Sequence, residues 1–321
     1  MLKTPLAILA VAATMAAAPT AALAGPPNPL KATTVLNGYD APQVAEPGAL
    51  AFRTSDGTAG VIDDALVQQR VPPVAGCRFA AAGGNHLAWD CGGELLQNRQ
   101  NPSDSKSVRH VAITDLAGTV LARPDVILRD GQPSAPDVVG SQWLRVSTPG
   151  NKSDARWVQN WRTGELRSGQ DDAQATHFDY DAATLVLPYC APIQAQAVAW
   201  SDSYSGPSYR PVEYRGGWAI VDTRTGHPVP TNPVHHELRR CGLARPVKAP
   251  ASLTTAIAVT LGDGWVAWRP RGTAARLHVM RLSDRRRWVV AARGRAMLTA
   301  ASLWVADDAT RQVSWARLPR G

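Results

Sequence analysis

The sequence predicts an all-β protein, a β-propeller of about five or six antiparallel blades. Three observations favour this fold class. The 25 prolines and 26 glycines interrupt the chain too often for long helices. Strand–turn–strand units recur along the chain. Several expected strands are apolar on both faces, whereas an antiparallel strand with one wet face would alternate. Burial of both faces is what radial stacking of small sheets produces.

The recurring unit is an apolar strand that runs into a turn of Asp, Thr and Gly, where glycine supplies a positive φ. The four copies begin at His110, Arg156, Gly217 and Leu277. The fourth copy has Arg285 where the others have a turn glycine, and successive turns are 46, 62 and 59 residues apart. At about 40–60 residues per blade, residues 49–321 accommodate five or six blades.

A partner strand that contains tryptophan precedes most copies. These tryptophans are Trp89, Trp143, Trp200, Trp265 and Trp268. Residues 265–268 and 288–292 are apolar throughout, so we expect both faces of each to be buried. Residues 302–306 and 312–318 pattern as the last strands, although 295–318 contain no Gly or Pro and a helix is the alternative.

We expect residues 49–62 to form the first hairpin, with its turn at Ser55-Asp56-Gly57. Propellers commonly close by pairing N-terminal and C-terminal strands in one blade, which removes exposed edges. We therefore expect residues 49–62 to lie beside residues 303–318. Residues 25–48 are rich in proline and are expected to form an irregular arm along the domain. The rival architecture is a pair of β-sandwich domains.

One blade carries a family resemblance. Residues 267–272 (Ala-Trp-Arg-Pro-Arg-Gly), with the strand at 277–282, resemble the Trp-Ser-Pro-Asp-Gly blade of TolB-type propellers, except that Arg269 and Arg271 replace Ser and Asp. Residues 303–313 are similar to the blade of NHL/YVTN-type propellers. The resemblance is best within 264–318 and implies a propeller fold. Those families are mostly binding scaffolds, but propellers host many unrelated functions.

The first 24 residues have the pattern of a secretory signal peptide. Lys3 precedes an apolar run, and Ala22-Leu23-Ala24 provides a small-x-small cleavage site. Cleavage after Ala24 predicts a secreted or periplasmic protein that is not an integral membrane protein. The alternative is an uncleaved membrane anchor, because residues 5–24 are nearly long enough to span a bilayer.

Export makes disulfides the natural interpretation of the four cysteines. A hairpin over residues 77–91 with a three-residue turn at Gly83-Gly84-Asn85 places Phe79 opposite Trp89. It also places Cys77 opposite Cys91, at a distance that permits a disulfide. By elimination, Cys190 pairs with Cys241. Zinc ligation is the rival, but the chain has no close-spaced cysteine pair.

The net charge of +8 comes from the C-terminal quarter, where residues 239–321 hold 16 Lys and Arg against 4 Asp and Glu. Such a surface attracts polyanions, for example an acidic envelope polymer or lipid head groups. Arginines spread over solvated strand edges are the alternative. The candidate anion contacts are Arg269, Arg271, Arg285, Arg286 and Arg287. Nothing in this region resembles a nucleic-acid module, so nucleic acid is not an expected partner.

The longest turn region, residues 201–216, is the leading candidate for a ligand-binding loop. Its 16 residues equal the excess of the 62-residue interval over the 46-residue one. Inserted loops commonly carry binding surfaces, and tyrosines among charges can stack on sugars or grip a peptide. The candidate residues are Tyr204, Tyr209, Arg210 and Tyr214. The alternative is that these rings fix the loop to its own blade.

Motifs for catalysis and cofactors are missing from the sequence: it has no Gly-x-Ser-x-Gly elbow, phosphate loop, dinucleotide fingerprint or Ca²⁺ loop. We expect no cofactor and no metal site. His235 and Glu237 could hold a metal from one strand face, but a solvated loop is the favoured interpretation. The acidic run is expected to be a polar loop, with Ca²⁺ binding or paired carboxylates as alternatives. Its residues are Asp171, Asp172, His177, Asp179 and Asp181.

The sequence therefore predicts an exported, non-catalytic binding or scaffold protein of the cell envelope or extracellular space. It would recognise a ligand through blade-connecting loops, and the ligand would be an envelope polymer, a glycan or a protein. The alternative is a secreted glycan-active hydrolase, which needs two carboxylates about 5–10 Å apart at the mouth of the channel.

Overall fold

The structure is a computed structural model. It describes residues 26–45, 48–96, 106–128, 134–136, 138–140, 142–148, 155–168, 178–179, 184–185, 208–215, 217–224, 235–240, 243 and 245–320. Nearly all of the regular structure in these residues is strand, together with one short helix, α2 (Ala251–Thr254). The predicted signal peptide, residues 1–24, lies outside the described residues. Within them, no helix is long and apolar enough to cross a bilayer.

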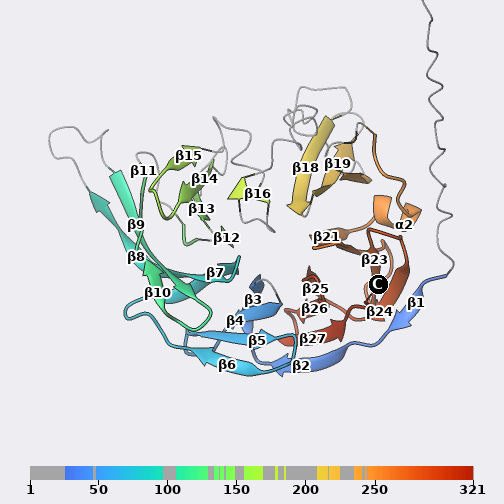
Figure 1. Cartoon of the computed structure of the whole chain (residues 1–321), viewed down its shortest axis with the longest axis horizontal. Helices are drawn as coiled ribbons and strands as arrows, with labels where there is room; N and C mark the ends of the chain where they lie inside the picture. The colour runs from blue at the N-terminus through green and yellow to red at the C-terminus, as the bar shows by residue number, and fades with distance from the viewer. Residues whose placement is uncertain are drawn as a thin grey trace, which may run out of the picture.

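Six sheets follow one another around a central space (Figure 1). We number them blades 1 to 6 in chain order. Blade 1 contains β3 (Asp40–Ala45), β4 (Ala49–Arg53), β5 (Ala59–Asp63) and β6 (Gln68–Val71). Blade 2 contains β7 (Arg78–Gly83), β8 (His86–Leu96), β9 (Lys106–Asp115) and β10 (Val120–Ala122), and β11 (Asp125–Leu128) also pairs with β9. Blade 3 contains β12 (Val138–Val139), β13 (Trp143–Thr148), β14 (Ala155–Asn160) and β15 (Leu166–Ser168).

The remaining three blades follow in chain order. Blade 4 contains β16 (Phe178–Asp179), β17 (Thr184–Leu185), β18 (Ser208–Arg215), β19 (Trp218–Arg224) and β20 (His235–Arg240). Blade 5 contains β21 (Ala258–Gly262), β22 (Trp265–Arg269), β23 (Arg276–Arg281), β24 (Arg287–Ala291) and β1 (Asn28–Leu30). Blade 6 contains β25 (Arg295–Leu298), β26 (Ser302–Asp307), β27 (Gln312–Arg317) and β2 (Thr33–Asn37). The propeller prediction is confirmed, and the rival pair of β-sandwiches is not what the chain forms.

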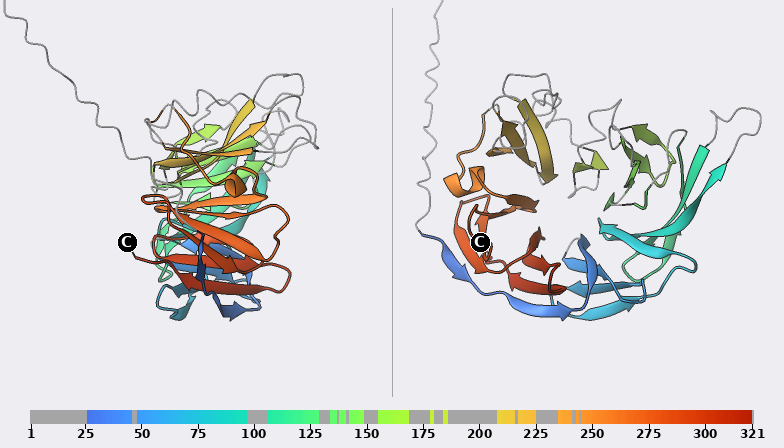
Figure 2. Two further views of the ribbon diagram at one scale, coloured as in Figure 1. Left: turned by 90° about the vertical axis from the view of Figure 1, so that its right-hand side faces the viewer. Right: turned by 180° about the vertical axis from the view of Figure 1, so that it is seen from behind.

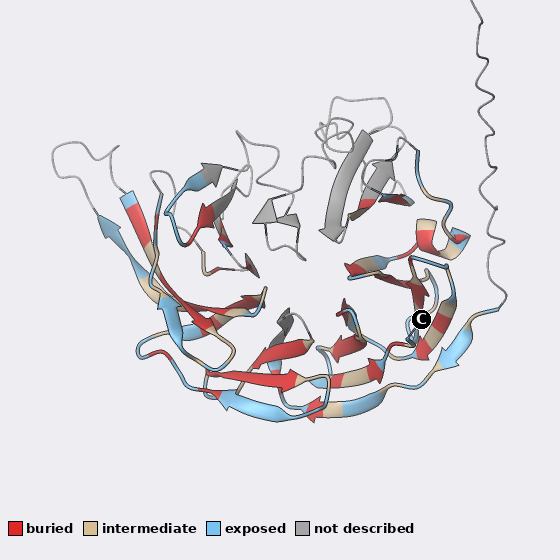
Figure 3. Ribbon diagram, viewed as in Figure 1, coloured by how far each residue is buried: buried red, intermediate tan, exposed pale blue. Residues whose placement is uncertain are grey.

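Both faces of the middle strands β4, β22 and β26 are buried, as their apolar runs predict. All five residues of β22 are buried. Because side chains alternate along a strand, Trp265 packs in the cluster shared with blade 6, and Trp268 packs in the cluster shared with blade 4. Burial of each such side chain contributes roughly 2 kcal/mol. The core therefore consists of layers between blades (Figure 3).

The outermost strands do not share this burial. The sequence 288–292 predicted burial on both faces, but in β24 only Trp288 and Val290 are buried, and Ala291 is exposed. The reason is position, because β24 lies near the rim of blade 5 and only β1 follows it in the sheet. Figure 3 shows the same exposure along β1, β2 and β6.

The N-terminal segment closes two blades, and Figures 1 and 2 show it following their outer side. β2 pairs antiparallel with β27, and β1 pairs parallel with β24. Residues 28–45 are therefore strands, whereas their prolines suggested an irregular arm. Pro29 is tolerated because β1 is an edge strand, where a missing N–H donor does little harm. Residues 49–62 do pack against blade 6, as expected, but the closing hydrogen bonds come from β2.

A second set of contacts fixes the start of blade 1 to blade 6. The Arg311 Nε donates to the Tyr39 carbonyl at 2.9 Å and its Nη2 to the Gly38 carbonyl at 3.1 Å. The Tyr39 hydroxyl donates to the Gln312 carbonyl at 3.0 Å. Burial, followed by the charge of Asp308, raises the pKa of Tyr39 to about 12, so the phenol remains a neutral donor.

The hairpin of blade 2 confirms the predicted disulfide. Phe79 lies opposite Trp89, and Cys77 is bonded to Cys91, with their Cα atoms 4.0 Å apart. The turn itself differs from the expectation, because it has two central residues, Gly84 and Asn85, both with positive φ. A bulge between Phe79 and Ala81 restores the expected register. Cys190 and Cys241 lie outside the described residues.

We predict that replacing Cys77 and Cys91 together by alanine lowers the free energy of unfolding by about 3 kcal/mol, the loop-closure entropy of a cross-link over some 15 residues. Urea unfolding of the oxidised protein and the double variant measures this difference. Wild-type protein under reducing conditions serves as the control and should approach the variant. Peptide mapping that linked Cys77 to Cys190 would contradict the pairing.

The interface between blades 1 and 6 contains a carboxyl group in an unfavourable, partly buried environment. Asp64, in the turn between β5 and β6, has a buried Oδ1 with no hydrogen-bond partner among the described residues. Burial raises the pKa of Asp64, and interactions with Ser302 and Trp315 of blade 6 offset only part of that effect. Ionised Asp64 therefore destabilises the folded state relative to its neutral form.

We predict that Asp64→Asn raises the free energy of unfolding at pH 7 by roughly 1 kcal/mol, since it removes a buried, incompletely bonded charge. A raised folded-state pKa means that wild-type stability falls as pH rises from the unfolded value toward the folded one. The gain should therefore disappear below about pH 4. Thermal unfolding from pH 3 to 8 tests this, and a gain that persists at pH 3 would count against it. Asp63→Asn, at the neighbouring carboxylate that caps the turn, should instead destabilise.

Candidate binding site

The described part of the tyrosine-bearing segment, residues 208–215, is a strand, and residues 201–207 and 216 lie outside the described residues. Tyr209, Arg210 and Tyr214 all belong to β18, while Tyr204 lies outside the described residues. β18 pairs along its length with β19, so the apolar run from Trp218 acquires a neighbour for its backbone groups. Pro211 lies at a register shift in this pairing, where its missing N–H is tolerated.

Arg269 has a structural position. Its side chain is buried, and its guanidinium donates to the carbonyls of Ala274, Ala292 (3.1 Å) and Gly294 (2.6 Å). These contacts join the connection between β22 and β23 to the link between blades 5 and 6. Burial lowers the pKa of Arg269 from its usual value, yet an arginine remains charged at neutral pH.

The other predicted anion contacts are distributed over blade 5. Arg271 is exposed in the connection between β22 and β23, and Arg287 begins β24. Arg285 and Arg286 lie in the turn between β23 and β24. Arg286 is exposed, and its Nε lies 3.5 Å from a carboxylate oxygen of Asp284. The structure therefore does not gather the five arginines into one patch.

The turn that carries Arg285 is fixed from within blade 5. The Arg281 guanidinium lies 5.8 Å from the ring centroids of both Trp265 and Trp288 and forms an ion pair with Asp284. The hydrogen bond from Arg281 is the main reason that the pKa of Asp284 is lowered. Arg285 follows with φ of 61°, a left-handed conformation like that of the turn glycines Gly118 and Gly164. Gly226 lies outside the described residues.

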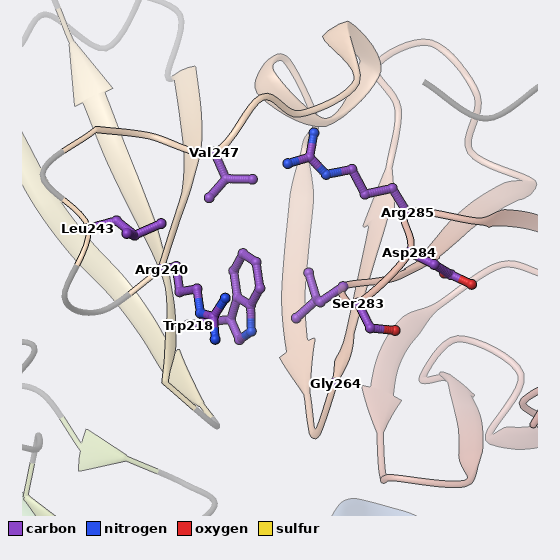
Figure 4. A pocket seen from close by; sticks show the side chains of 9 residues that line it. Trp218, Arg240, Leu243, Val247, Gly264, Ser283, Asp284 and Arg285 are labelled. Carbon is purple, nitrogen blue, oxygen red and sulfur yellow. The ribbon is translucent and has the colours of Figure 1, made fainter. Parts of the chain in front are cut away.

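Arg285 borders a cleft of about 540 Å³ between blades 4 and 5, which we call the blade 4–5 cleft (Figure 4). Its lining residues are Trp218, Arg240, Leu243, Val247, Gly264, Leu282, Ser283, Asp284 and Arg285. Blade 4 contributes Trp218 and Arg240, directly opposite each other on β19 and β20. The turns of blade 5 contribute the opposite wall.

The chemistry of the blade 4–5 cleft is apolar and cationic. The Arg240 guanidinium lies 5.9 Å from the centroid of the Trp218 ring, and Leu243 is 51% exposed beside it. Arg285 donates to the Lys248 carbonyl at 3.3 Å. Asp284 is already held by Arg281 and Arg286. Among the described residues, no carboxylate pairs with Arg240 or Arg285, so the cleft suits an anionic group attached to an apolar one.

The structure describes part of two other sequence candidates, the His235–Glu237 group and the acidic run. His235, His236 and Glu237 belong to β20 rather than to a loop, and Glu237 accepts hydrogen bonds from Arg239 at 3.0 and 2.7 Å. In the described part of the chain, no group of three or more His, Cys, Asp or Glu could hold a metal. Of the acidic run, only Asp179 is described, on β16; Asp171, Asp172, His177 and Asp181 are not.

Sequence reasoning missed Trp218 and Arg240 as members of one site. They are far apart in sequence, and only the pairing of β19 with β20 brings them together. The available signal was the Trp at the start of the third copy, followed by a basic pair next to Cys241. Those residues indicated a strand and a disulfide, respectively.

Comparison with known proteins shows similarity only at the level of fold. No protein-family model and no curated protein matches the sequence. Solved structures with a similar fold include TolB from Acinetobacter baumannii (10% identity, TM-score 0.37, 85% of this chain and 64% of that one). They also include YCF48 bound to D1 peptide (10%, 0.42, 95% and 100%). A third is the acylaminoacyl peptidase of Pyrococcus horikoshii (11%, 0.40, 88% and 45%), of which this chain spans less than half the length. TolB-type propellers are thus among the similar folds, as residues 264–318 suggested.

We predict that Arg269→Met lowers the free energy of unfolding by about 3 kcal/mol, because several carbonyls lose a charged donor at once. Arg269→Lys should recover only part of this loss, since an ammonium cannot span the same acceptors. Urea unfolding gives both values. The control is Arg271→Met, at an exposed position two residues away, which should change stability by less than about 0.5 kcal/mol. Equal effects at positions 269 and 271 would disprove the structural role of Arg269.

Proposed function

We propose that this protein is an exported, non-catalytic binding protein that recognises an anionic segment of a partner protein through blade-connecting turns. The observation that carries the proposal is the placement of Arg240 and Arg285 at one cleft, over an apolar surface of Trp218, Leu243 and Val247. Aromatic and arginine side chains around apolar pockets commonly dominate the energetics of protein interfaces.

The anionic character of the partner follows from charge. The one carboxylate of the cleft, Asp284, is bonded to Arg281 and Arg286. An acidic side chain placed between Arg240 and Arg285 would gain two charge-assisted interactions. An adjacent apolar residue of the partner would cover Trp218 and the exposed Leu243.

Export is supported by the signal-like pattern of residues 1–24 and by the disulfide between Cys77 and Cys91, because disulfides persist in oxidising compartments. The cell envelope or extracellular space is accordingly the proposed location. The tyrosines of residues 201–216 remain a second hypothesis for ligand contact, and two of them, Tyr209 and Tyr214, lie on β18. The hydrolase alternative needs two close carboxylates, and the described inner strands β3, β7, β12, β16, β21 and β25 carry two, Asp40 and Asp179, on different blades.

The test of this function is capture of partners by the purified protein from a detergent-solubilised envelope fraction and from culture supernatant, quantified by mass spectrometry. We predict that Arg240→Gln combined with Arg285→Gln reduces the captured amount of the specific partner about tenfold, the effect of losing a charge-assisted contact. Raising the salt concentration should weaken wild-type capture in the same direction.

The matched control is Arg271→Gln combined with Arg320→Gln, which removes the same charge from positions outside the cleft lining. Capture by this control should equal that of wild type. Circular dichroism and thermal unfolding confirm that both double variants are folded. If the cleft variant and the control lose capture equally, net charge rather than the cleft is responsible, and the proposal fails.

A further inference from the structure

A second cavity, of about 850 Å³, lies among blades 4, 5 and 6, and we call it the three-blade cavity. It is separate from the blade 4–5 cleft, because the two contact opposite ends of one hairpin. The cleft includes Gly264, in the turn that joins β21 to β22. The three-blade cavity includes Ala258, at the start of β21, and Arg269, at the end of β22.

The apolar lining of the three-blade cavity comes from all three blades. Ile220 belongs to blade 4, Val259 and Leu277 to blade 5, and Met297 to blade 6. Ile257 also lines the cavity and is 57% exposed. An exposed isoleucine that borders a concave apolar surface gains most when a ligand covers it.

The charges that line this cavity are all positive. They are Arg269, Arg293 and Arg295, and no Asp or Glu of the described residues lines it. Arg269 is 7% exposed, and its donors are satisfied by backbone carbonyls, which do not neutralise its charge. Arg293 is exposed and makes no hydrogen bond or ion pair with any described residue.

Three other titratable groups bear on the charge of the cavity: His236, Asp307 and Asp308. His236 lines it, with its Nε2 3.0 Å from the Ala256 carbonyl. Arg295 opposes Asp307 and Asp308 in their effect on the pKa of Tyr39, and neither carboxylate lines the cavity. The buried Arg269 and the exposed Arg293 therefore produce a positive potential over an apolar floor.

We propose that the three-blade cavity binds an anionic amphiphile of low molecular weight, with one carboxylate or phosphate head and one alkyl chain. The head would lie at Arg293 and Arg295, and the chain would cover Ile257, Val259, Leu277 and Met297. The volume is in the range of small-molecule sites. Binding of an amphiphile goes beyond recognition of a protein partner, because it takes place in the three-blade cavity and not in the blade 4–5 cleft.

Binding is tested by isothermal titration calorimetry with four probes below their micelle concentrations: dodecanoate, dodecyl phosphate, dodecanol and dodecyltrimethylammonium. We expect saturable one-to-one binding of an anionic probe. The affinities for uncharged dodecanol and cationic dodecyltrimethylammonium should be lower by about tenfold or more. The stronger of the two anions identifies the head group as carboxylate or phosphate. Equal affinity for dodecanol, or adsorption of several equivalents without saturation, would overturn the proposal.

Two variants locate the site. Arg293→Gln combined with Arg295→Gln should weaken the anionic probe about tenfold and leave dodecanol unchanged, because only the head group loses contacts. Ile257→Glu, at an exposed position, should weaken every anionic probe. Arg240→Gln combined with Arg285→Gln, at the blade 4–5 cleft, serves as the control and should leave amphiphile binding as in wild type.

The outcomes separate this proposal from the proposed function. Loss of amphiphile binding in the Arg293/Arg295 variant, together with unchanged partner capture, supports two sites. Unchanged dodecanoate and dodecyl phosphate affinity in that variant would disprove the three-blade cavity as the site. A short peptide with a leucine-rich C-terminus that displaces the anionic probe with higher affinity would identify the ligand as a peptide and overturn the amphiphile assignment.

Discussion

Coverage of both faces of every middle strand is the constraint on which this structure depends. A sheet whose alternating side chains are all apolar cannot face water on either side, so it needs a neighbour in both directions. β22 illustrates this, because Trp265 packs toward blade 6 while Trp268 packs toward blade 4. A ring of blades satisfies every such strand at once. The loops and turns at the ends of the blades then do not have to contribute to the core, and they can carry charged side chains.

The two cavities form where charged turns meet the apolar layers between blades. Blade 5 holds its arginines at the ends of its strands, where Arg281 organises one turn and Arg269 organises the opposite one. Each of these arginines has hydrogen-bond partners in blade 5 or in the segments that adjoin it, Pro319 for Arg281 and Gly294 for Arg269. The neighbours that they position, Arg285 in the first case and the link bearing Arg293 in the second, present charge to open space between blades.

Much of the fold was predictable because continuous apolar runs between turn residues are a local signal. The apolar strands, the hairpin at residues 49–62 and the pairing of Cys77 with Cys91 all follow from residues close in sequence. Closure by β2 was not predictable in detail, because β2 is a short strand in a proline-rich segment and its partner is 280 residues away. The candidate site was predicted only through Arg285. Trp218 and Arg240 meet through register, and the burial of Arg269 depends on carbonyls from separate connections.

The pairing of β2 with β27 also sets the order in which the molecule can be completed. A chain that emerges from its N-terminus presents Thr33 long before Trp315, its partner, exists. Until then β1 and β2 are unpaired edges, which are prone to join the wrong sheet. Pro29 and the polar threonines of β2 make that mispairing less favourable. The proline that makes β1 hard to recognise in the sequence therefore also reduces mispairing at this edge until the partner strand is available. Blades 5 and 6, which border the two cavities, therefore cannot acquire all their strands until both ends of the chain are present.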